Sequence, residues 1–196
     1  TGSSKTANAM NSDSLRRYAL LSLAAIQLAL PLWMIRDHLH LLDTGAEFRF
    51  HAQAVSSGSS ISGKYIQLSF YADSFRTVED SSWREGETVY LVIENDATGF
   101  GKIASVLRSP SNSIPSYLKT NVRLFLKPGN LIYFNFPFDK YFLEENKVRE
   151  EKLQSLWSWT DAPPELTAIV RIHNGKALLS GLLVEGKPIE ERFSQE

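Results

Sequence analysis

The sequence predicts a mainly β fold, at the margin of the α+β class, built from antiparallel strands and attached to one N-terminal transmembrane helix. Three observations lead to this prediction. Residues 18–35 contain no charged side chain. Beyond residue 46, apolar and polar residues alternate as in half-buried strands, and Gly-containing turns separate these segments. We expect about eight strands, arranged as a small sandwich or barrel with one flanking helix.

The uncharged stretch is long enough to cross a membrane. Eighteen helical residues span about 27 Å, close to the ~30 Å hydrocarbon core of a bilayer. Arg16 and Arg17 precede the stretch, and Tyr18 and Trp33 lie near its two ends, where aromatic side chains gather at membrane interfaces. Because basic residues favour the cytoplasmic side, we expect a single-pass anchor with a cytoplasmic N-terminus.

Two alternatives for this stretch stay open. A buried core helix would explain the interruptions at Gln27 and Pro31, although Ser22 and Gln27 alone make a poor polar face. A cleaved signal peptide would explain the preceding arginines, but the apolar run is longer than the ~7–15 residues of a typical signal core.

Composition excludes several classes of function. The 196 residues include 21 basic and 22 acidic side chains, for a net charge of −1, which gives no indication of a nucleic-acid surface. The chain has no cysteine, which excludes disulfide bonds, thiolate zinc sites and a catalytic cysteine. His38 and His40 lie two residues apart without a third ligand nearby, so we predict no metal site.

The sequence divides into five parts. Residues 1–17 form a polar leader that we expect to be disordered and cytoplasmic, and residues 1–9, before Met10, have the character of an added segment. The other parts are the anchor (18–35), a juxtamembrane linker that ends at Gly45 (36–45), an extracytoplasmic β-rich domain (46–190) and a tail (191–196). We expect the charged region from Lys187 onward to fray.

Local patterns place strands, loops and one helix in the domain. Strand patterns occupy residues 47–54, 64–72, 88–95, 100–109, 121–127, 131–138, 165–174 and 176–186, loops 55–63, 73–87, 96–99 and 111–116, and a charged helix 143–157. Pro128-Gly129 suits a type II turn, and Asn174-Gly175 is typical of a two-residue hairpin. In the hairpin that turns at Pro128-Gly129, one face should carry Val122, Leu124 and Leu126. Both faces of this hairpin are apolar enough that we expect other parts of the domain to cover them.

The second strand pattern carries the motif GKYIQLSF, residues 63–70. It is similar to the signature of the GDYXXLXY family, which consists of bacterial membrane-anchored envelope proteins without an assigned activity. Gly63, Tyr65 and Leu68 match the signature, whereas Lys64 stands in place of aspartate and Phe70 in place of tyrosine. The resemblance covers roughly residues 18–186. It implies an inner-membrane protein with a periplasmic domain, and a multi-span membrane protein as its partner.

Two further groups of residues are candidates for interaction. Trp83, in the polar segment 73–87, is either an anchor for a partner or folded back onto the domain, which is the commoner arrangement. Asp139, Lys140 and Tyr141 precede the charged helix. A carboxylate, a lysine and a tyrosine can serve acid-base chemistry, but charged residues before a helix are more often caps and partners of the helix dipole.

The sequence does not define a reaction. It contains no GxSxG or HExxH motif and no Gly-rich phosphate loop, and His51 and His173 are far apart without a marked acidic partner. We therefore assign no catalytic, cofactor-binding or metal-binding residue. We expect a non-enzymatic, membrane-anchored module that binds a membrane partner or an envelope component. The alternative is a membrane-tethered hydrolase of the Ser/Lys type acting on envelope peptides or lipids, because Ser and Lys are plentiful.

Overall fold

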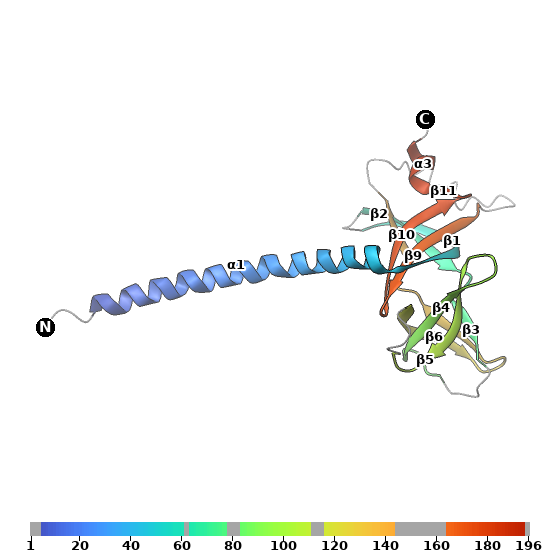
Figure 1. Cartoon of the computed structure of the whole chain (residues 1–196), viewed down its shortest axis with the longest axis horizontal. Coiled ribbons are helices and arrows are strands. Elements are labelled where there is room, and N and C mark those ends of the chain that lie inside the picture. The colour runs from blue at the N-terminus through green and yellow to red at the C-terminus, as the bar shows by residue number, and fades with distance from the viewer. Residues whose placement is uncertain (1–4, 61–62, 78–82, 111–115, 144–163, 195–196) are drawn as a thin grey trace. The chain divides into compact units, whose positions relative to one another are not determined.

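A computed structural model describes residues 5–60, 63–77, 83–110, 116–143 and 164–194. The chain divides into two units, Thr1–His40 and Leu41–Glu196. The first unit is helical and the second contains the strands (Figure 1). The charged helix predicted at residues 143–157 lies, apart from its first residue, outside the described residues.

The described residues of the first unit belong to one long helix, which continues to Thr44. Helix α1 (Lys5–Thr44) begins within the segment expected to be a disordered leader and contains Pro31. Its part from Ser14 to Thr44 is long and apolar enough to cross a membrane, and no residue of the apolar window within it is buried. A core helix would have those side chains buried. The Gly45 N–H donates to the Leu41 carbonyl at 2.9 Å. The helix therefore ends at Thr44, directly before Gly45, as the sequence predicted.

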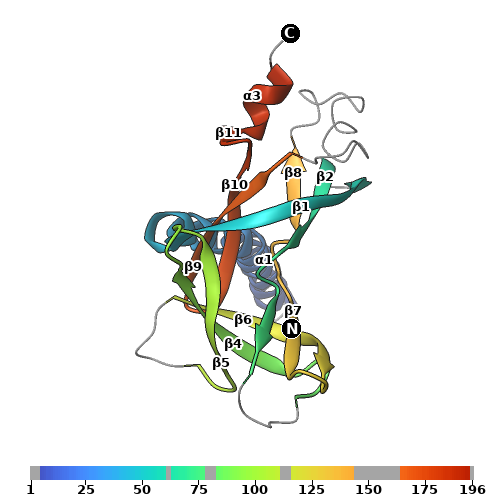
Figure 2. The same ribbon diagram turned by 90° about the vertical axis from the view of Figure 1, so that its right-hand side faces the viewer.

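The second unit contains two antiparallel sheets. The first has the order β11 (Lys187–Pro188), β10 (Lys176–Val184), β9 (Leu166–His173), β1 (Ala46–Ser60), β2 (Gly63–Phe70) and β8 (Lys140–Leu143). The second has the order β3 (Ser74–Arg76), β7 (Leu131–Asn135), β6 (Tyr117–Leu126), β4 (Thr88–Asn95) and β5 (Gly101–Leu107). The sheets form a half-barrel and a nearly closed barrel, and Figure 2 shows β1, β2 and β10 above β4, β5 and β6. The mainly antiparallel β fold is therefore confirmed, with eleven strands in the described residues.

One hydrophobic core joins the two sheets. Four phenylalanines, contributed by β1, β2 and the segment after β7, form its aromatic part, with ring centroids 5.0–6.2 Å apart: Phe50, Phe70, Phe136 and Phe138. Phe50 is fully buried and reaches β5 of the other sheet, where a Cβ on Gly101 would lie 2.8 Å from its ring. Close approach of the sheets therefore requires glycine at position 101.

Both predicted hairpin turns are confirmed by their backbone angles. Asn174 and Gly175 have φ of 47° and 82°, which is the pair of positive values that a type I′ turn needs. Gly129 has φ of 95° and the Asn130 N–H donates to the Lys127 carbonyl at 3.2 Å, as in a type II turn with Pro128 first. The β4–β5 hairpin is also present, with its tip at residues 96–99.

Two segments predicted as loops contain strand. Residues 55–60 belong to β1, because β1 pairs with β2 as far as Ser60 and Gly63 despite a bulge at Val55. Serine and glycine have low strand propensity, but cross-strand pairing outweighs it here. Ser74–Arg76 within the predicted loop 73–87 forms β3, which pairs with β7.

The predicted faces of the β6–β7 hairpin are wrong beyond Val122. A register shift between Val122 and Leu124 leaves Val122 buried, whereas Leu124 and Leu126 are 38% and 39% exposed. Phe125 packs against the core in their place. A bulge inserts one residue and so reverses the alternation that follows it. With Leu124 and Leu126 exposed, the expectation that both faces are covered is also wrong.

The C-terminal region is more ordered than predicted. Lys187 and Pro188 pair with Val184 and Leu183, and α3 (Ile189–Ser194) follows. Ile189 is fully buried in the core, so residues 187–189 are held to the domain and the expected fraying from Lys187 is wrong for them.

Candidate functional site

The motif strand β2 has two chemically different faces. Ile66, Leu68 and Phe70 point into the core and are at most 5% exposed. Tyr65 and Gln67 lie on the opposite face and are half-buried. This period of two was predicted from the sequence and follows from strand geometry. Gly63 begins the strand with φ of 109°, a conformation that favours glycine.

Pairing between β2 and β8 brings two groups of predicted site residues together. Lys140 lies opposite Gln67, and Tyr141 lies opposite Ile66. In the next positions Phe142 lies opposite Tyr65, and Leu143 opposite Lys64. The Asp139 carbonyl accepts the Leu68 N–H at 2.7 Å, just before this ladder. Residues 63–70 and 139–141, which are about seventy residues apart in the sequence, therefore lie side by side on two paired strands.

Three side chains form an aromatic and cationic cluster on the outer face of this ladder. The rings of Tyr65 and Phe142 have centroids 5.9 Å apart, and Lys140 Nζ lies 5.0 Å from the Tyr65 centroid. Phe142 is 49% exposed. We call Tyr65, Lys140 and Phe142 the β2–β8 face. Tyr65 also covers Gly58 on β1, where a Cβ would lie 2.6 Å from its hydroxyl oxygen.

Tyr141 lies on the inner side and holds the C-terminal helix. Its ring packs against the core, and its hydroxyl donates to Glu190 Oε1 of α3. Tyr141 and Lys140 are neighbours in the chain and were predicted as members of one group. The structure places the two side chains on opposite faces of β8, because successive strand residues alternate.

Trp83 is folded back onto the domain. It packs against the core, and the Arg108 guanidinium lies 4.5 Å above its ring. Its Nε1 is buried and has no acceptor among the described residues. Of the two predicted roles for Trp83, the structure therefore supports packing and not an exposed anchor.

A groove of about 380 Å³ is lined by residues from strands of both sheets. Its lining includes the apolar side chains of Leu68, Phe70 and Phe134. The Arg123 guanidinium and the Asp73 carboxylate, 2.7 Å apart, form an ion pair on its wall. Asp139 also lines this groove. Arg123 is the residue at the β6 bulge. The bulge reverses the alternation of side-chain faces along β6, and it also directs the Arg123 side chain to the groove.

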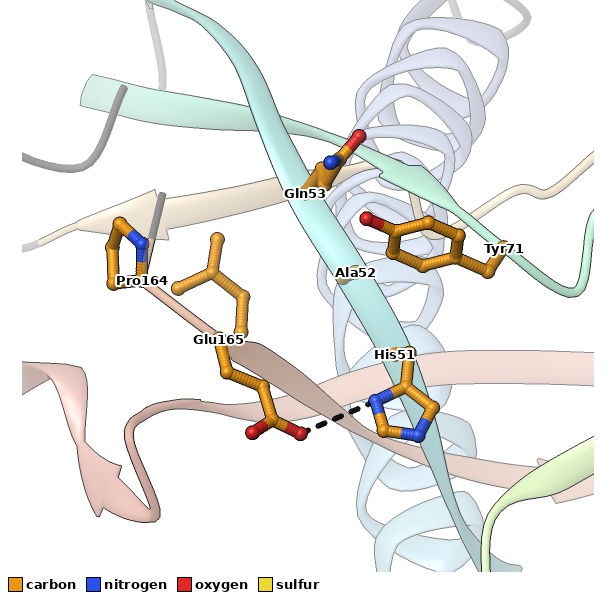
Figure 3. A pocket seen from close by; sticks show the side chains of 7 residues that line it. His51, Ala52, Gln53, Tyr71, Pro164 and Glu165 are labelled. Carbon is orange, nitrogen blue, oxygen red and sulfur yellow. Dashed lines mark ion pairs between the residues drawn. The ribbon is translucent and has the colours of Figure 1, made fainter. Parts of the chain in front are cut away.

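A second cleft, of about 410 Å³, lies over the start of β9 (Figure 3). The Nδ1 of His51 is 3.4 Å from Oε1 of Glu165, and the imidazole stacks on Phe100 with centroids 3.6 Å apart. Gln53 and Tyr71 complete the polar lining. Sequence analysis missed the acidic partner of His51, because the two residues are over a hundred positions apart and meet only through β1–β9 pairing.

The contact between His51 and Glu165 is open to solvent. The side chains of His51 and Glu165 are 43% and 67% exposed, which makes their contact a surface ion pair of about 0–1 kcal/mol. The Ser180 hydroxyl donates to the Ile169 carbonyl at 3.1 Å and not to a lysine. Within the described residues, no group of three or more His, Cys, Asp or Glu is placed to hold a metal ion.

The tip of the β4–β5 hairpin carries a perturbed carboxylate. Asp96 Oδ1 accepts the Thr98 hydroxyl at 2.6 Å, the Thr98 N–H at 2.8 Å and the Phe100 N–H at 3.0 Å. These hydrogen bonds, the Thr98 hydroxyl first, hold the pKa of Asp96 below its ordinary value of 3.8. The Asp96 carboxylate closes the hairpin turn, so the lowering of its pKa has a structural cause.

Comparison with known proteins identifies the chain at the level of family. A family model described as GDYXXLXY protein matches residues 27–182, well over half of the chain. The match runs from the middle of α1 into β10 and includes the motif strand β2. No curated protein and no solved structure matches the chain. The chain belongs to the GDYXXLXY family.

Proposed function

We propose that this protein is a single-pass, membrane-anchored binding module. Helix α1 anchors it in the bacterial inner membrane with the N-terminus in the cytoplasm, and the β domain lies in the periplasm. The domain binds a membrane protein or another envelope component through the β2–β8 face. The family model supports the general class, because it matches the motif strand and the part of the apolar helix from residue 27 onward.

The charge distribution around α1 supports this orientation. Arg16 and Arg17 precede the uncharged stretch, whereas Arg36 is the only basic residue among those between Met34 and Glu47 apart from histidines. Basic residues are enriched on the cytoplasmic side of membrane helices. The C-terminal unit is then on the periplasmic side.

The observation that carries the binding role is the exposure of the β2–β8 face. Phe142 keeps about half of its surface exposed beside an aromatic ring and a cation. Aromatic side chains with a polar or cationic neighbour are typical of the centres of protein interfaces. Tethering both partners to one membrane raises their effective concentration, so a small contact surface is sufficient.

Crosslinking in native membranes tests the proposal. We compare the full-length protein with Phe142→Ser and with Leu124→Ser, which removes a similarly exposed apolar side chain on the other sheet. We expect a specific crosslinked membrane or envelope protein from the wild type and from Leu124→Ser, and a loss of about tenfold or more from Phe142→Ser.

Equal recovery from both variants would refute the role of the β2–β8 face. Recovery of no crosslinked species from the wild type, with the protein itself present in the membrane fraction, would refute the binding proposal as a whole. In that case the purified protein would be screened for hydrolase activity on envelope peptides and lipids.

A further inference from the structure

Gln27 places unsatisfied polar groups at the middle of the apolar stretch of α1. Its side chain is exposed, and residue 27 lies at the centre of residues 18–35. Pro31, four residues later, is inside the helix and has no N–H. The Gln27 carbonyl therefore lacks its usual helical donor. One position on the helix thus carries a carboxamide and a main-chain acceptor that both need partners.

The other polar side chain in the stretch differs from Gln27 in this respect. The Ser22 hydroxyl donates to the Tyr18 carbonyl at 2.8 Å, within its own helix. At about 100° per residue, Ser22 and Gln27 lie on nearly opposite sides of α1. The side of Gln27 is therefore the one whose polar groups the helix does not satisfy.

A membrane makes this requirement strong. The hydrocarbon core contains no water to accept or donate hydrogen bonds, and an unpaired amide there costs several kcal/mol by transfer estimates. Carboxamide side chains in membrane helices accordingly form hydrogen bonds across helix interfaces. A neighbouring helix with a polar group at the same depth would satisfy Gln27.

A second copy of α1 supplies such a group without any further assumption. All copies insert with the same orientation, so their helices are parallel and their Gln27 side chains lie at the same depth. Each carboxamide has two N–H donors and one acceptor oxygen. A two-fold axis through this position pairs the donors of one copy with the acceptors of the other. A different protein would need its own polar residue at that depth.

The spacing around Gln27 suits a close parallel pair. The residues on its side follow a spacing of alternately three and four, which is the seam of a left-handed helix pair: Leu20, Leu23, Gln27, Leu30 and Met34. A single polar residue in such a seam fixes the register and the number of helices. Apolar residues occur all around the helix, so they do not mark one side as the contact surface. The Gln27 amide does mark one side.

We propose that α1 pairs with α1 of a second copy, with the two Gln27 carboxamides hydrogen-bonded to each other at the middle of the membrane. The proposal rests on the membrane anchoring described above. It assigns Gln27 the role of a positioning residue for assembly, and it predicts that the β2–β8 face is presented as two copies.

Single cysteines test this pairing directly, because the natural chain has none. Relative to Gln27, Leu23 is turned by about 40° around the helix and Leu21 by about 120°. We expect full-length Leu23→Cys to form a disulfide-linked dimer on mild oxidation in native membranes, and the matched control Leu21→Cys to form several-fold less. Equal linkage at both positions would overturn the proposal.

Substitution of Gln27 tests the role of the carboxamide. In the Leu23→Cys background, Gln27→Leu should weaken dimer association roughly three- to thirtyfold, the range for polar contacts between membrane helices. Gln27→Asn, which keeps the amide, should restore most of the linkage. Unchanged linkage in Gln27→Leu would overturn the proposal, as would linkage of Leu23→Cys to a different polypeptide in place of a second copy.

Alkaline carbonate extraction separates this inference from the proposed function. If the protein resists extraction and Leu23→Cys still shows no preference over Leu21→Cys, pairing through Gln27 is refuted and anchoring stands. If the protein is extracted as a peripheral or soluble species, the anchor is refuted and the pairing with it.

Discussion

The two faces of β2 differ in what surrounds them, and the difference separates side chains that form the core from side chains that remain partly exposed. On the inner face, Ile66, Leu68 and Phe70 are almost completely buried among core residues of both sheets. On the outer face, Tyr65 meets Lys140 and the half-exposed Phe142 of β8. The same eight residues therefore belong to the core on one side and carry a partly exposed aromatic and cationic group on the other.

This division assigns different roles to the residues that resemble the family signature. Leu68 and Phe70 are core residues, and Phe70 belongs to the aromatic cluster. Tyr65 is the motif side chain at the surface, where it covers Gly58 and faces Phe142. Substitutions on the inner face should reduce stability, and those on the outer face should leave most of it intact.

The largest expected effect is on the inner face. Phe70→Ala should lower the free energy of unfolding by about 3–5 kcal/mol, because it removes buried apolar surface and leaves a cavity in the aromatic cluster. Urea unfolding of the full-length protein in detergent micelles, followed by circular dichroism, measures this loss. A loss below about 1 kcal/mol would show that this face is not the stabilising one.

Tyr65→Ala should have a smaller effect, a loss of about 1 kcal/mol, since cross-strand pairs in sheets contribute about 0.2–1 kcal/mol each. The substitution uncovers Gly58 and removes the contact with Phe142. Tyr65→Phe is the matched control and should unfold like the wild type in the same assay. If Tyr65→Ala destabilises as much as Phe70→Ala, the two faces do not differ as described.

Lys140→Gln should reduce stability by no more than about 0.5–1 kcal/mol, the range for an exposed cation-π contact. The lysine is exposed and its Nζ lies over the Tyr65 ring. The same variant should reduce recovery of the crosslinked partner in membranes, because the cation belongs to the proposed contact surface. Loss of stability without loss of recovery would contradict the assignment of Lys140 to a binding face.

The smallest expected effect lies away from β2, at Asp96. Its folded pKa is lowered, so the charged carboxylate stabilises the β4–β5 hairpin above the ordinary pKa of 3.8, and this contribution is lost as the pH falls through the lower folded value. Asp96→Asn should therefore be slightly less stable than the wild type at pH 7. Unfolding measured at pH 7 and pH 3 should show the difference shrink, and a constant difference would contradict the assigned cause.

The parts of the fold that depend on neighbouring residues could be predicted. Positive φ at Asn174 and Gly175 follows from residue type, and the alternation of Ile66, Leu68 and Phe70 follows from strand geometry. The uncharged stretch of α1 needs only composition and length. Each of these features is decided within a few residues, where propensity and period suffice.

The candidate site could be predicted only in its components. Gly63, Lys64 and Tyr65 were one candidate group and Asp139, Lys140 and Tyr141 another, but nothing in the sequence pairs β2 with β8. Phe142 was not singled out, since its exposure depends on its place at the sheet edge. The bulge at Arg123 was missed for a similar reason, because an inserted residue is defined only against the partner strand β7.

By itself the sequence determined an uncharged helix with Gln27 at its centre, a mainly antiparallel β domain, and turns at Pro128-Gly129 and Asn174-Gly175. These are consequences of side-chain polarity and backbone sterics over short distances. The tertiary structure alone decided which strands are neighbours and hence that Tyr65, Lys140 and Phe142 share one face. Strand pairing joins residues far apart in the chain, and its choice depends on how the whole core packs, which no local pattern contains.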